Sequence, residues 1–381
     1  MHFTPIDYAE TDEHRMIQQT ARKFLAEKLA PIASQIDQEE RFALEVFKGL
    51  GELGLLALIA PEEHGGGGHD VIGTAIVAEE ISKICAGTYT SVQGHVFCTH
   101  WIDKYATPEQ KKRYLPKLAS TEWIGGIAIT EADAGSDVAS LKTKAVRQGD
   151  HYVLNGSKTF ITNGSVASVI VCLTRTGGPG PKGISTFIVE TASPGFSASK
   201  PFEKCGNRAS PTCEITFEDC RVPAANLLGK ENNGFIESMV FFPFERALVA
   251  VCCGALCESA LMQAVSYCKD RKQFSKPIIE FQMVQQMLAE MAVDLQITKT
   301  LTRDTLRKYA SGSDANVDAS IAKIFAADAA MRVTSHAVQL LGGYGYTREF
   351  PVERWFRDAR LFSIGGGTSQ IQKLIVARAL M

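Results

Sequence analysis

The 381-residue sequence lacks an excess of either charge and lacks any apolar run long enough to cross a membrane. Its 40 basic and 42 acidic side chains leave a net charge of −2, and the basic residues are scattered, so the charge pattern of a nucleic-acid-binding protein is missing. The longest apolar run, Ala247–Cys257, is about half as long as the roughly 20 residues that a membrane-spanning helix needs. We therefore expect no nucleic-acid partner and no membrane span.

Signals for export and for cysteine-based sites are also missing. The start of the chain carries acidic residues from Asp7 onward and no apolar segment flanked by small residues, so we expect no signal or transit peptide and a cytoplasmic location. The 10 cysteines lie mostly in apolar surroundings, and no pair at Cys-x-x-Cys spacing is followed by histidines at metal-ligand spacing. Cys253 and Cys257 share a helical face with no histidine near, and we expect this pair to pack in a core rather than to bind a metal.

The chain divides into three regions of different hydrophobic periodicity. Apolar residues recur at spacings of three and four in residues 1–121, which indicates helices. Short β-rich runs separated by glycine, proline, asparagine and aspartate fill residues 122–230, which predicts an antiparallel sheet or small barrel. Long helical periods return in residues 231–381. We expect an α+β multidomain fold with an N-terminal helical domain, a middle antiparallel β domain and a C-terminal helical bundle.

Six polar stretches are the candidates for chemistry, because function lies in sites and not in folds. They are Ala128–Asp137, Asn155–Gly164, Phe244–Arg246, Asp270–Phe274, Gln339–Tyr346 and Arg357–Gln370. In this order and spacing they make the chain resemble the acyl-CoA dehydrogenase family of flavoproteins along nearly its whole length. The resemblance implies bound FAD, a C-terminal four-helix bundle and assembly as a dimer of dimers, which is a homotetramer.

The first two stretches have a physical reading as a flavin site. Small residues let a backbone approach a ligand closely, and the N–H groups and hydroxyls of Thr130 and Ser136 can hydrogen-bond the edge of a planar ring, although a polar turn has the same composition. Phe160 offers an aromatic ring and Thr162 a hydroxyl, although a strand ending in a turn would look similar. The resemblance implies that Thr162 hydrogen-bonds flavin N5, the atom that receives hydride.

The remaining cofactor positions imply a site shared between subunits. Arg271 follows a helix, where a cation is usually only a partner of the helix dipole. The matching family residue instead binds the FAD pyrophosphate of a neighbouring subunit, so the cofactor site would need a dimer. The full set that we expect to bind FAD is Ile129, Thr130, Gly135, Ser136, Phe160, Thr162, Arg271, Phe274, Gln339, Gly342, Gly343, Thr368 and Gln370.

The sequence departs from the usual family pattern at Gly366. Many relatives have a glutamate at this position that removes the α-proton of the thioester, whereas glycine has no side chain to accept one. A minority of the family carries its base at the helix position that Glu245 matches. A carboxylate among the aromatic residues of 241–244 is desolvated, which should raise its pKa. The paired change predicts that Glu245 is the catalytic base.

An alternative is that Glu245 only begins a helix. Pro243 indicates a helix start, which would place Glu245 in the first turn, where the dipole favours a carboxylate with no catalytic role. In the mechanism that the resemblance implies, Glu245 takes the α-proton as the β-hydride passes to flavin. The N–H of Gly366 and a ribityl hydroxyl of FAD polarise the thioester carbonyl. An electron-transfer flavoprotein is the expected electron acceptor, by family analogy.

The substrate is expected to be an acyl thioester on CoA or on a carrier protein. Glycine at 366 leaves space near the reacting carbons, so we hypothesise that branched or cyclic acyl groups fit. Residues 90–101 match a helix that lines the family's substrate site and contain no arginine, which argues against a dicarboxyl substrate. The candidate substrate contacts are His95, Phe97, Thr99 and Arg246. A histidine satisfied by local hydrogen bonds is the alternative for His95.

Other functions remain open on the sequence. The chain could oxidise an aminoacyl thioester held on a carrier protein, or it could reduce an enoyl thioester. More distant options are a monooxygenase or desulfinase that acts on other substrates, and a catalytically silent FAD-bound assembly partner. Glu245 discriminates the last option from the enzymes, because in an enzyme that uses this base Glu245→Gln should abolish flavin reduction by substrate without loss of FAD.

Overall fold

The computed structural model describes residues 3–381, and its N-terminal region is helical as predicted. Thr11 caps the first helix by accepting from the N–H of His14, and Thr107 forms a capping box with Gln110 at the last one. The helices are α1 (Asp12–Lys28), α2 (Ala33–Gln38), α3 (Leu44–Glu52), α4 (Val71–Ile84), α5 (Ala86–Tyr105) and α6 (Pro108–Ala119). Nearly every residue of α4 is buried, so this helix belongs to the core.

The middle region forms one eight-stranded sheet in the order β6-β7-β3-β2-β4-β5-β8, with β1 paired to β4. Its strands are β1 (Gly125–Ala128), β2 (Lys144–Gln148), β3 (His151–Thr162), β4 (Val169–Arg175), β5 (Ile184–Glu190), β6 (Phe196–Ala198), β7 (Thr212–Pro223) and β8 (Leu227–Leu228). The expected antiparallel sheet needs a correction. The pairs β1–β4 and β2–β4 are parallel, so the sheet is mixed. Hydrophobic alternation reports which face of a strand is buried, and it carries no information on the direction of a neighbour.

The C-terminal region is the predicted helical bundle. Its helices are α7 (Gly234–Asp270), α8 (Gln282–Ala310), α9 (Asn316–Leu341), α10 (Val352–Ala359) and α11 (Ser369–Arg378), and a short hairpin of β9 (Lys272–Gln273) and β10 (Lys276–Pro277) joins the first two. Helices α7, α8 and α9 pack against one another, and α11 packs on α9. The α+β fold class is therefore confirmed.

The prediction that Pro243 begins a helix is wrong. Helix α7 begins at Gly234, and Pro243 lies in its interior. Proline removes one backbone hydrogen bond from a helix, which is tolerable here because α7 packs against α4, α5, α8 and α9. Glu245 is consequently a mid-helix residue, and the dipole of the helix N-terminus, which acts within the first turn, does not stabilise its carboxylate.

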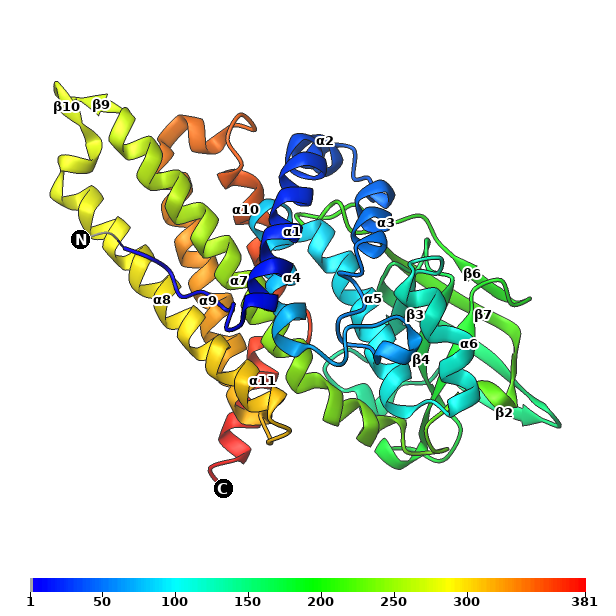
Figure 1. Cartoon of the computed structure of the whole chain (residues 1–381). Helices are drawn as coiled ribbons and strands as arrows, with labels where there is room; N and C mark the ends of the chain where they lie inside the picture. Colours follow the sequence, from blue (N-terminus) through cyan, green and yellow to red (C-terminus); the bar gives the residue numbers. More distant parts are fainter. Residues whose placement is uncertain (1–2) are drawn as a thin grey trace.

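Figure 1 shows the sheet at one end of the molecule and the bundle at the other, with α1 and α4 between them. Strand β4 shows how the parts join. Val169, Val171 and Leu173 belong to the large core that the sheet shares with the helices, whereas Ile170 and Cys172 point into a second core inside the β region. Helix α5 contacts β1, β4 and α7, so it bridges the sheet and the bundle.

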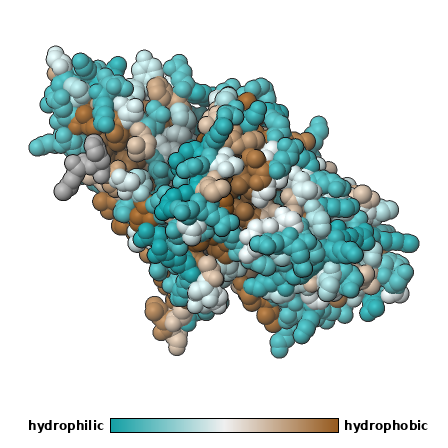
Figure 2. All heavy atoms as spheres, in the orientation of Figure 1, coloured by the Kyte–Doolittle hydropathy of each residue, from teal (hydrophilic) through white to brown (hydrophobic). Residues whose placement is uncertain are grey.

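Helix α7 is long and apolar enough to cross a membrane by length and composition, but 72% of its apolar window is buried in the protein. A core helix of this kind passes the same test, so the finding is weak evidence for a span. On the face shown in Figure 2, hydrophilic side chains cover much of the surface, and apolar patches interrupt them. One such patch lies over α8, where Met283, Val293 and Ile297 are exposed.

Candidate active site

The fold brings together Glu245 of α7, the first helix of the bundle, and Gly366, which precedes the last helix, α11. Gly366 lies between the last turn of α10 and α11 with φ of +63°, a left-handed conformation that favours glycine. A Cβ atom placed on Gly366 would be 3.1 Å from Oε1 of Glu245. A side chain at 366 would therefore compete for the space that the Glu245 carboxylate occupies.

The Glu245 carboxyl group is buried and, among the residues that the structure describes, has a free oxygen, as a group that accepts a proton from a substrate requires. Its Oε2 is inaccessible to solvent and has no hydrogen-bond partner among residues 3–381. Burial raises the pKa of this carboxyl, and the positive charges of Lys323 and Arg246 oppose the rise. The neighbouring aromatic rings of Phe241 and Phe244 are fully buried. The group can accept a proton, because nothing in the described chain uses its second oxygen.

Arg246 points away from this carboxylate toward α9. Its Nη1 donates to Asn316 Oδ1 at 2.7 Å and to Ser320 Oγ at 3.4 Å, and the guanidinium lies 5.6 Å from the centre of the Phe242 ring. The guanidinium is therefore held by the bundle. Its role as a substrate contact stays a prediction.

Lys323 is a residue of this site that the sequence reading did not identify. It projects from α9, is fully buried, and donates from Nζ to the carbonyl of Gly365 at 2.6 Å and to the carbonyl of Gly367. Gln372 of α11 donates to the carbonyls of Gly366 and Gly367, at 3.1 Å each. The available signal was a lone lysine on the apolar face of a helix, at a position where a charge is costly unless it is used.

The first group of expected cofactor residues is assembled at the β region. The N–H of Thr159 donates to the Thr130 carbonyl at 2.9 Å, so the stretch after β1 lies beside the end of β3. Lys158 reinforces the pair by donating to the Ile129 carbonyl at 3.0 Å and to Glu131 at 2.9 Å. Residues Gly135, Ser136 and Phe160 are exposed, and Thr162 is partly buried.

Two details make this surface accessible to a planar ligand. Phe160 has φ of +58° at a bulge in β3, and its exposed ring lies 5.5 Å from that of Phe202. A Cβ atom on Gly135 would meet no atom within 4 Å. Thr162 packs against α5, where a Cβ on Gly94 would be 3.2 Å from its methyl group. Helix α5 therefore lies directly behind the expected flavin position.

The second group of expected cofactor residues lies elsewhere in the chain. Arg271, Gly342 and Gly343 line a cavity of about 520 Å³ at the end of the bundle, and Phe274 is 90% exposed at the tip of the β9–β10 hairpin. Figure 1 places this hairpin at the opposite end of the molecule from β3. Gln339 and Gln370 are exposed, and Thr368 caps α11 by accepting from Ile371. One copy of the chain does not bring the two groups together.

The three candidate substrate contacts on α5 are buried. Nδ1 of His95 accepts from the Gly125 N–H at 3.1 Å, and burial lowers the pKa of His95 to about 4. Thr99 donates to the His95 carbonyl at 2.9 Å. Phe97 packs edge-on against Phe241, with ring centres 5.2 Å apart. The Nδ1 atom of His95 thus has a local partner, whereas its buried Nε2 has none among residues 3–381. Both the local alternative for His95 and the substrate role of all three residues stay predictions.

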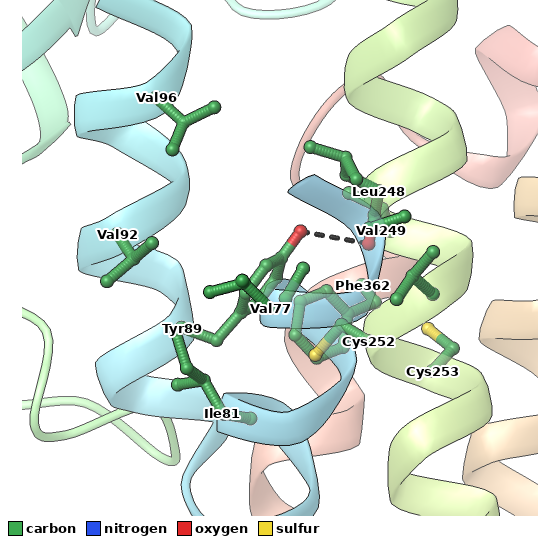
Figure 3. Packing of buried hydrophobic residues seen from close by; sticks show 14 of the residues in the cluster. Val77, Ile81, Tyr89, Val92, Val96, Leu248, Val249, Cys252, Cys253 and Phe362 are labelled. Atoms are coloured by element: carbon green, nitrogen blue, oxygen red, sulfur yellow. Dashed lines mark hydrogen bonds between the residues drawn. The ribbon is translucent and has the colours of Figure 1, made fainter. Parts of the chain in front are cut away.

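An apolar wall lies between α5 and α7, next to Glu245 along the helix. Figure 3 shows Tyr89, Val92 and Val96 of α5 facing Leu248 and Val249 of α7, with the Tyr89 hydroxyl donating to the Leu248 carbonyl at 2.8 Å. These side chains are all buried. The carboxylate of Glu245 therefore stands at the edge of an apolar region that is tied across two helices.

Three family models match consecutive parts of the chain. They are the acyl-CoA dehydrogenase N-terminal domain at residues 11–122, the middle domain at 126–220 and the C-terminal domain at 232–381. Together they span most of the sequence.

Individual relatives match over most or all of their length. A short-chain-specific acyl-CoA dehydrogenase from Clostridium acetobutylicum is 42% identical over 98% of this chain and 99% of its own. A mitochondrial isovaleryl-CoA dehydrogenase from Pongo abelii is 39% identical over 97% of this chain and 89% of its own. Among solved structures, butyryl-CoA dehydrogenase from Megasphaera elsdenii superimposes with a TM-score of 0.96 at 36% identity, over 98% of this chain and 100% of the other.

Proposed function

The chain belongs to the acyl-CoA dehydrogenase family, and we propose that it oxidises a short acyl-CoA to the trans-2-enoyl-CoA with Glu245 as the base that removes the α-proton. Proteins of this family are oxidoreductases that act on CH–CH groups. The observation that carries the base assignment is the 3.1 Å between Oε1 of Glu245 and the place where a side chain at Gly366 would begin. The carboxylate thus reaches the same space that a glutamate at 366 would enter.

The residues present fit FAD. An exposed aromatic ring at Phe160 and the open space around Gly135 suit the close approach of a flat ring system. Cβ atoms on Gly342 and Gly343 would also meet no atom within 4 Å, beside the Arg271 guanidinium that would bind a pyrophosphate. Bound FAD supplies the acceptor for the hydride that leaves the β-carbon. Because Arg271, Gly342 and Gly343 lie at the opposite end of the molecule from β3, we propose that each cofactor is held by two copies.

Residues of the chain remove the α-proton and hydrogen-bond the thioester. The α-C–H proton passes to the Glu245 carboxylate, and the electron pair of that bond becomes part of the new Cα–Cβ double bond. The Gly366 N–H donates to no acceptor among residues 3–381, so it is free to hydrogen-bond the thioester oxygen as negative charge develops there. Burial of Glu245 favours its neutral product form, which assists proton removal.

The acyl group is proposed to be short, either straight or methyl-branched. The relatives named above act on short-chain, isovaleryl or butyryl thioesters by their names. The apolar wall formed by Val92, Val96, Leu248 and Val249 suits a hydrocarbon chain and offers no cation for a second carboxylate.

Assembly and electron transfer follow from the same premise. The exposed apolar patch on α8 and the divided cofactor site support a homotetramer, and an electron-transfer flavoprotein is the proposed electron acceptor. A cytoplasmic location stays a prediction.

The test is anaerobic bleaching of the flavin in purified parent protein and in Glu245→Gln. We expect butyryl-CoA and isovaleryl-CoA to bleach the parent, and the variant to keep its FAD but to bleach at least ~100-fold more slowly, the contribution of a general base. Glu237→Gln is the matched control, because Glu237 is another buried glutamate on α7, and it accepts hydrogen bonds from Lys230 and Asn233 instead.

Parental bleaching of Glu245→Gln would refute the base assignment. Bleaching of the parent only by a carrier-bound aminoacyl thioester would move the substrate to a carrier protein, and no bleaching by any thioester would favour a silent protein.

A further inference from the structure

The buried ammonium group of Lys323 hydrogen-bonds the residues on both sides of Gly366. Its Nζ bonds the carbonyls of Gly365 and Gly367, the residues before and after the glycine. The same nitrogen lies 3.9 Å from the Cβ position of Gly366, which is 3.1 Å from Oε1 of Glu245. The lysine and the glutamate therefore border Gly366 together, one from α9 and the other from α7.

A charge in this place is costly and has no full partner. Lys323 makes no ion pair within 4.0 Å in the part of the chain that the structure describes, and the two carbonyl dipoles of Gly365 and Gly367 only partly replace its hydration. Burial lowers the pKa of the Lys323 ammonium, and the negative charge of Glu245 opposes that change. An apolar side chain would fill the same volume without this cost, so the retained charge calls for a role.

We propose that Lys323 is a positioning residue for the dehydrogenation: it fixes the loop that presents the Gly366 N–H, and its positive charge holds the Glu245 carboxylate in the ionised form that accepts the proton. This inference rests on the proposed function of Glu245. Gly366 and Gly367 both have positive φ, so the loop has no regular hydrogen-bonded ladder of its own to hold it in place.

Among the charged and titratable groups around Glu245, Lys323 is the cation whose charge we expect to control the ionisation of the carboxylate. From α5, the Tyr89 hydroxyl is neutral because burial raises its pKa far above the usual value. From α7, the Arg246 guanidinium is engaged by Asn316 and Ser320, and burial raises the pKa of the Cys253 thiol. Removing the lysine charge would thus leave one cation, which is already bonded elsewhere.

The test is the pH dependence of flavin reduction by butyryl-CoA in the FAD-loaded parent, Lys323→Gln, Lys323→Met and Lys323→Arg. Glu245 must be ionised to react, so the rate falls on the acid side. We expect that acid limb to move upward by on the order of one to two pH units in Lys323→Gln, from the loss of a unit charge at close range. Lys323→Met should show the same shift, which keeps the test usable if one of the two fails to fold. Lys323→Arg should titrate close to the parent.

Lys299→Gln is the matched control. Lys299 is equally buried on α8, but its ion pairs are with Glu79 at 2.8 Å and with Glu258, away from the glycine loop. It should lower the melting temperature and leave the acid limb in place. An unchanged acid limb in Lys323→Gln and Lys323→Met, while Glu245→Gln abolishes reduction, would overturn the inference alone. Reduction that survives in Glu245→Gln would overturn the proposed function instead.

Discussion

Replacing Gly366 with alanine is the sharpest test of the geometry at the reaction centre. The substitution adds one methyl group at a place where the chain has φ of +63° and where Glu245 Oε1 lies 3.1 Å from the new carbon. Two separable effects follow: a backbone strain that destabilises the fold, and a displacement of the carboxylate that slows the reaction.

The size of each effect can be worked out. A left-handed conformation costs a non-glycine residue about 1–2 kcal/mol, which should appear as a lower free energy of unfolding. Ordinary van der Waals contacts begin near 3.4 Å, so the carboxylate must retreat by 3.4 − 3.1 = 0.3 Å. Because a misplacement of about 1 Å can cost roughly 100-fold in rate, a shift of this size should slow flavin reduction on the order of 3- to 10-fold.

The assay pairs anaerobic stopped-flow flavin bleaching with urea denaturation. Gly312→Ala is the matched control, since Gly312 has φ of +77° in the turn before α9 and a Cβ there would meet no atom within 4 Å. Gly312→Ala should lose similar stability and keep the parental rate. If Gly366→Ala bleaches as fast as the parent, or if Gly312→Ala slows equally, the placement of Glu245 beside residue 366 is wrong.

Two further outcomes concern groups outside the reaction centre. The pKa of His95 is about 4 in the fold and near 6.5 when unfolded, so the unfolded chain binds the extra proton between these values and stability rises with pH across that window. His95→Gln should reduce the rise of melting temperature between pH 4 and 6.5 without abolishing it, because burial also lowers the pKa of His100 to about 4. An unaltered slope would show that His95 does not contribute to the rise. Arg271→Gln should lose FAD on gel filtration, as measured by absorbance per chain, because it removes the cation proposed for the pyrophosphate. Full retention of FAD would argue against the divided site.

The sequence predicted those features of the fold that depend on a local pattern of residues. Helical and strand periodicities separated the three regions, because burial of one face depends only on residue spacing. The resemblance to the family implied that the carboxylate of Glu245 compensates for the missing side chain at Gly366, before any distance between them was known.

Local sequence signals gave wrong or incomplete predictions where contacts with a distant part of the chain stabilise the structure. Pro243 is a helix-start signal, yet α7 continues past it because the helix is stabilised by packing against four other helices. The parallel pairing of β1 with β4 brings together strands that are not neighbours in sequence. In the sequence Lys323 is only a lysine on the apolar face of a helix, and its role could not be predicted because its carbonyl partners belong to a loop far along the chain.

The residue types and spacing were thus enough to predict the order of the three regions and to reveal the family resemblance, and the resemblance in turn implied Glu245 as the candidate base. Only the tertiary structure decided that Oε1 of Glu245 lies 3.1 Å from the Cβ position of Gly366 and that its second oxygen is buried with no partner among residues 3–381. It also decided that Lys323 hydrogen-bonds the loop beside it. The reason is physical: desolvation, pKa and contact depend on which atoms from remote segments share a volume, and no periodicity in the chain encodes that.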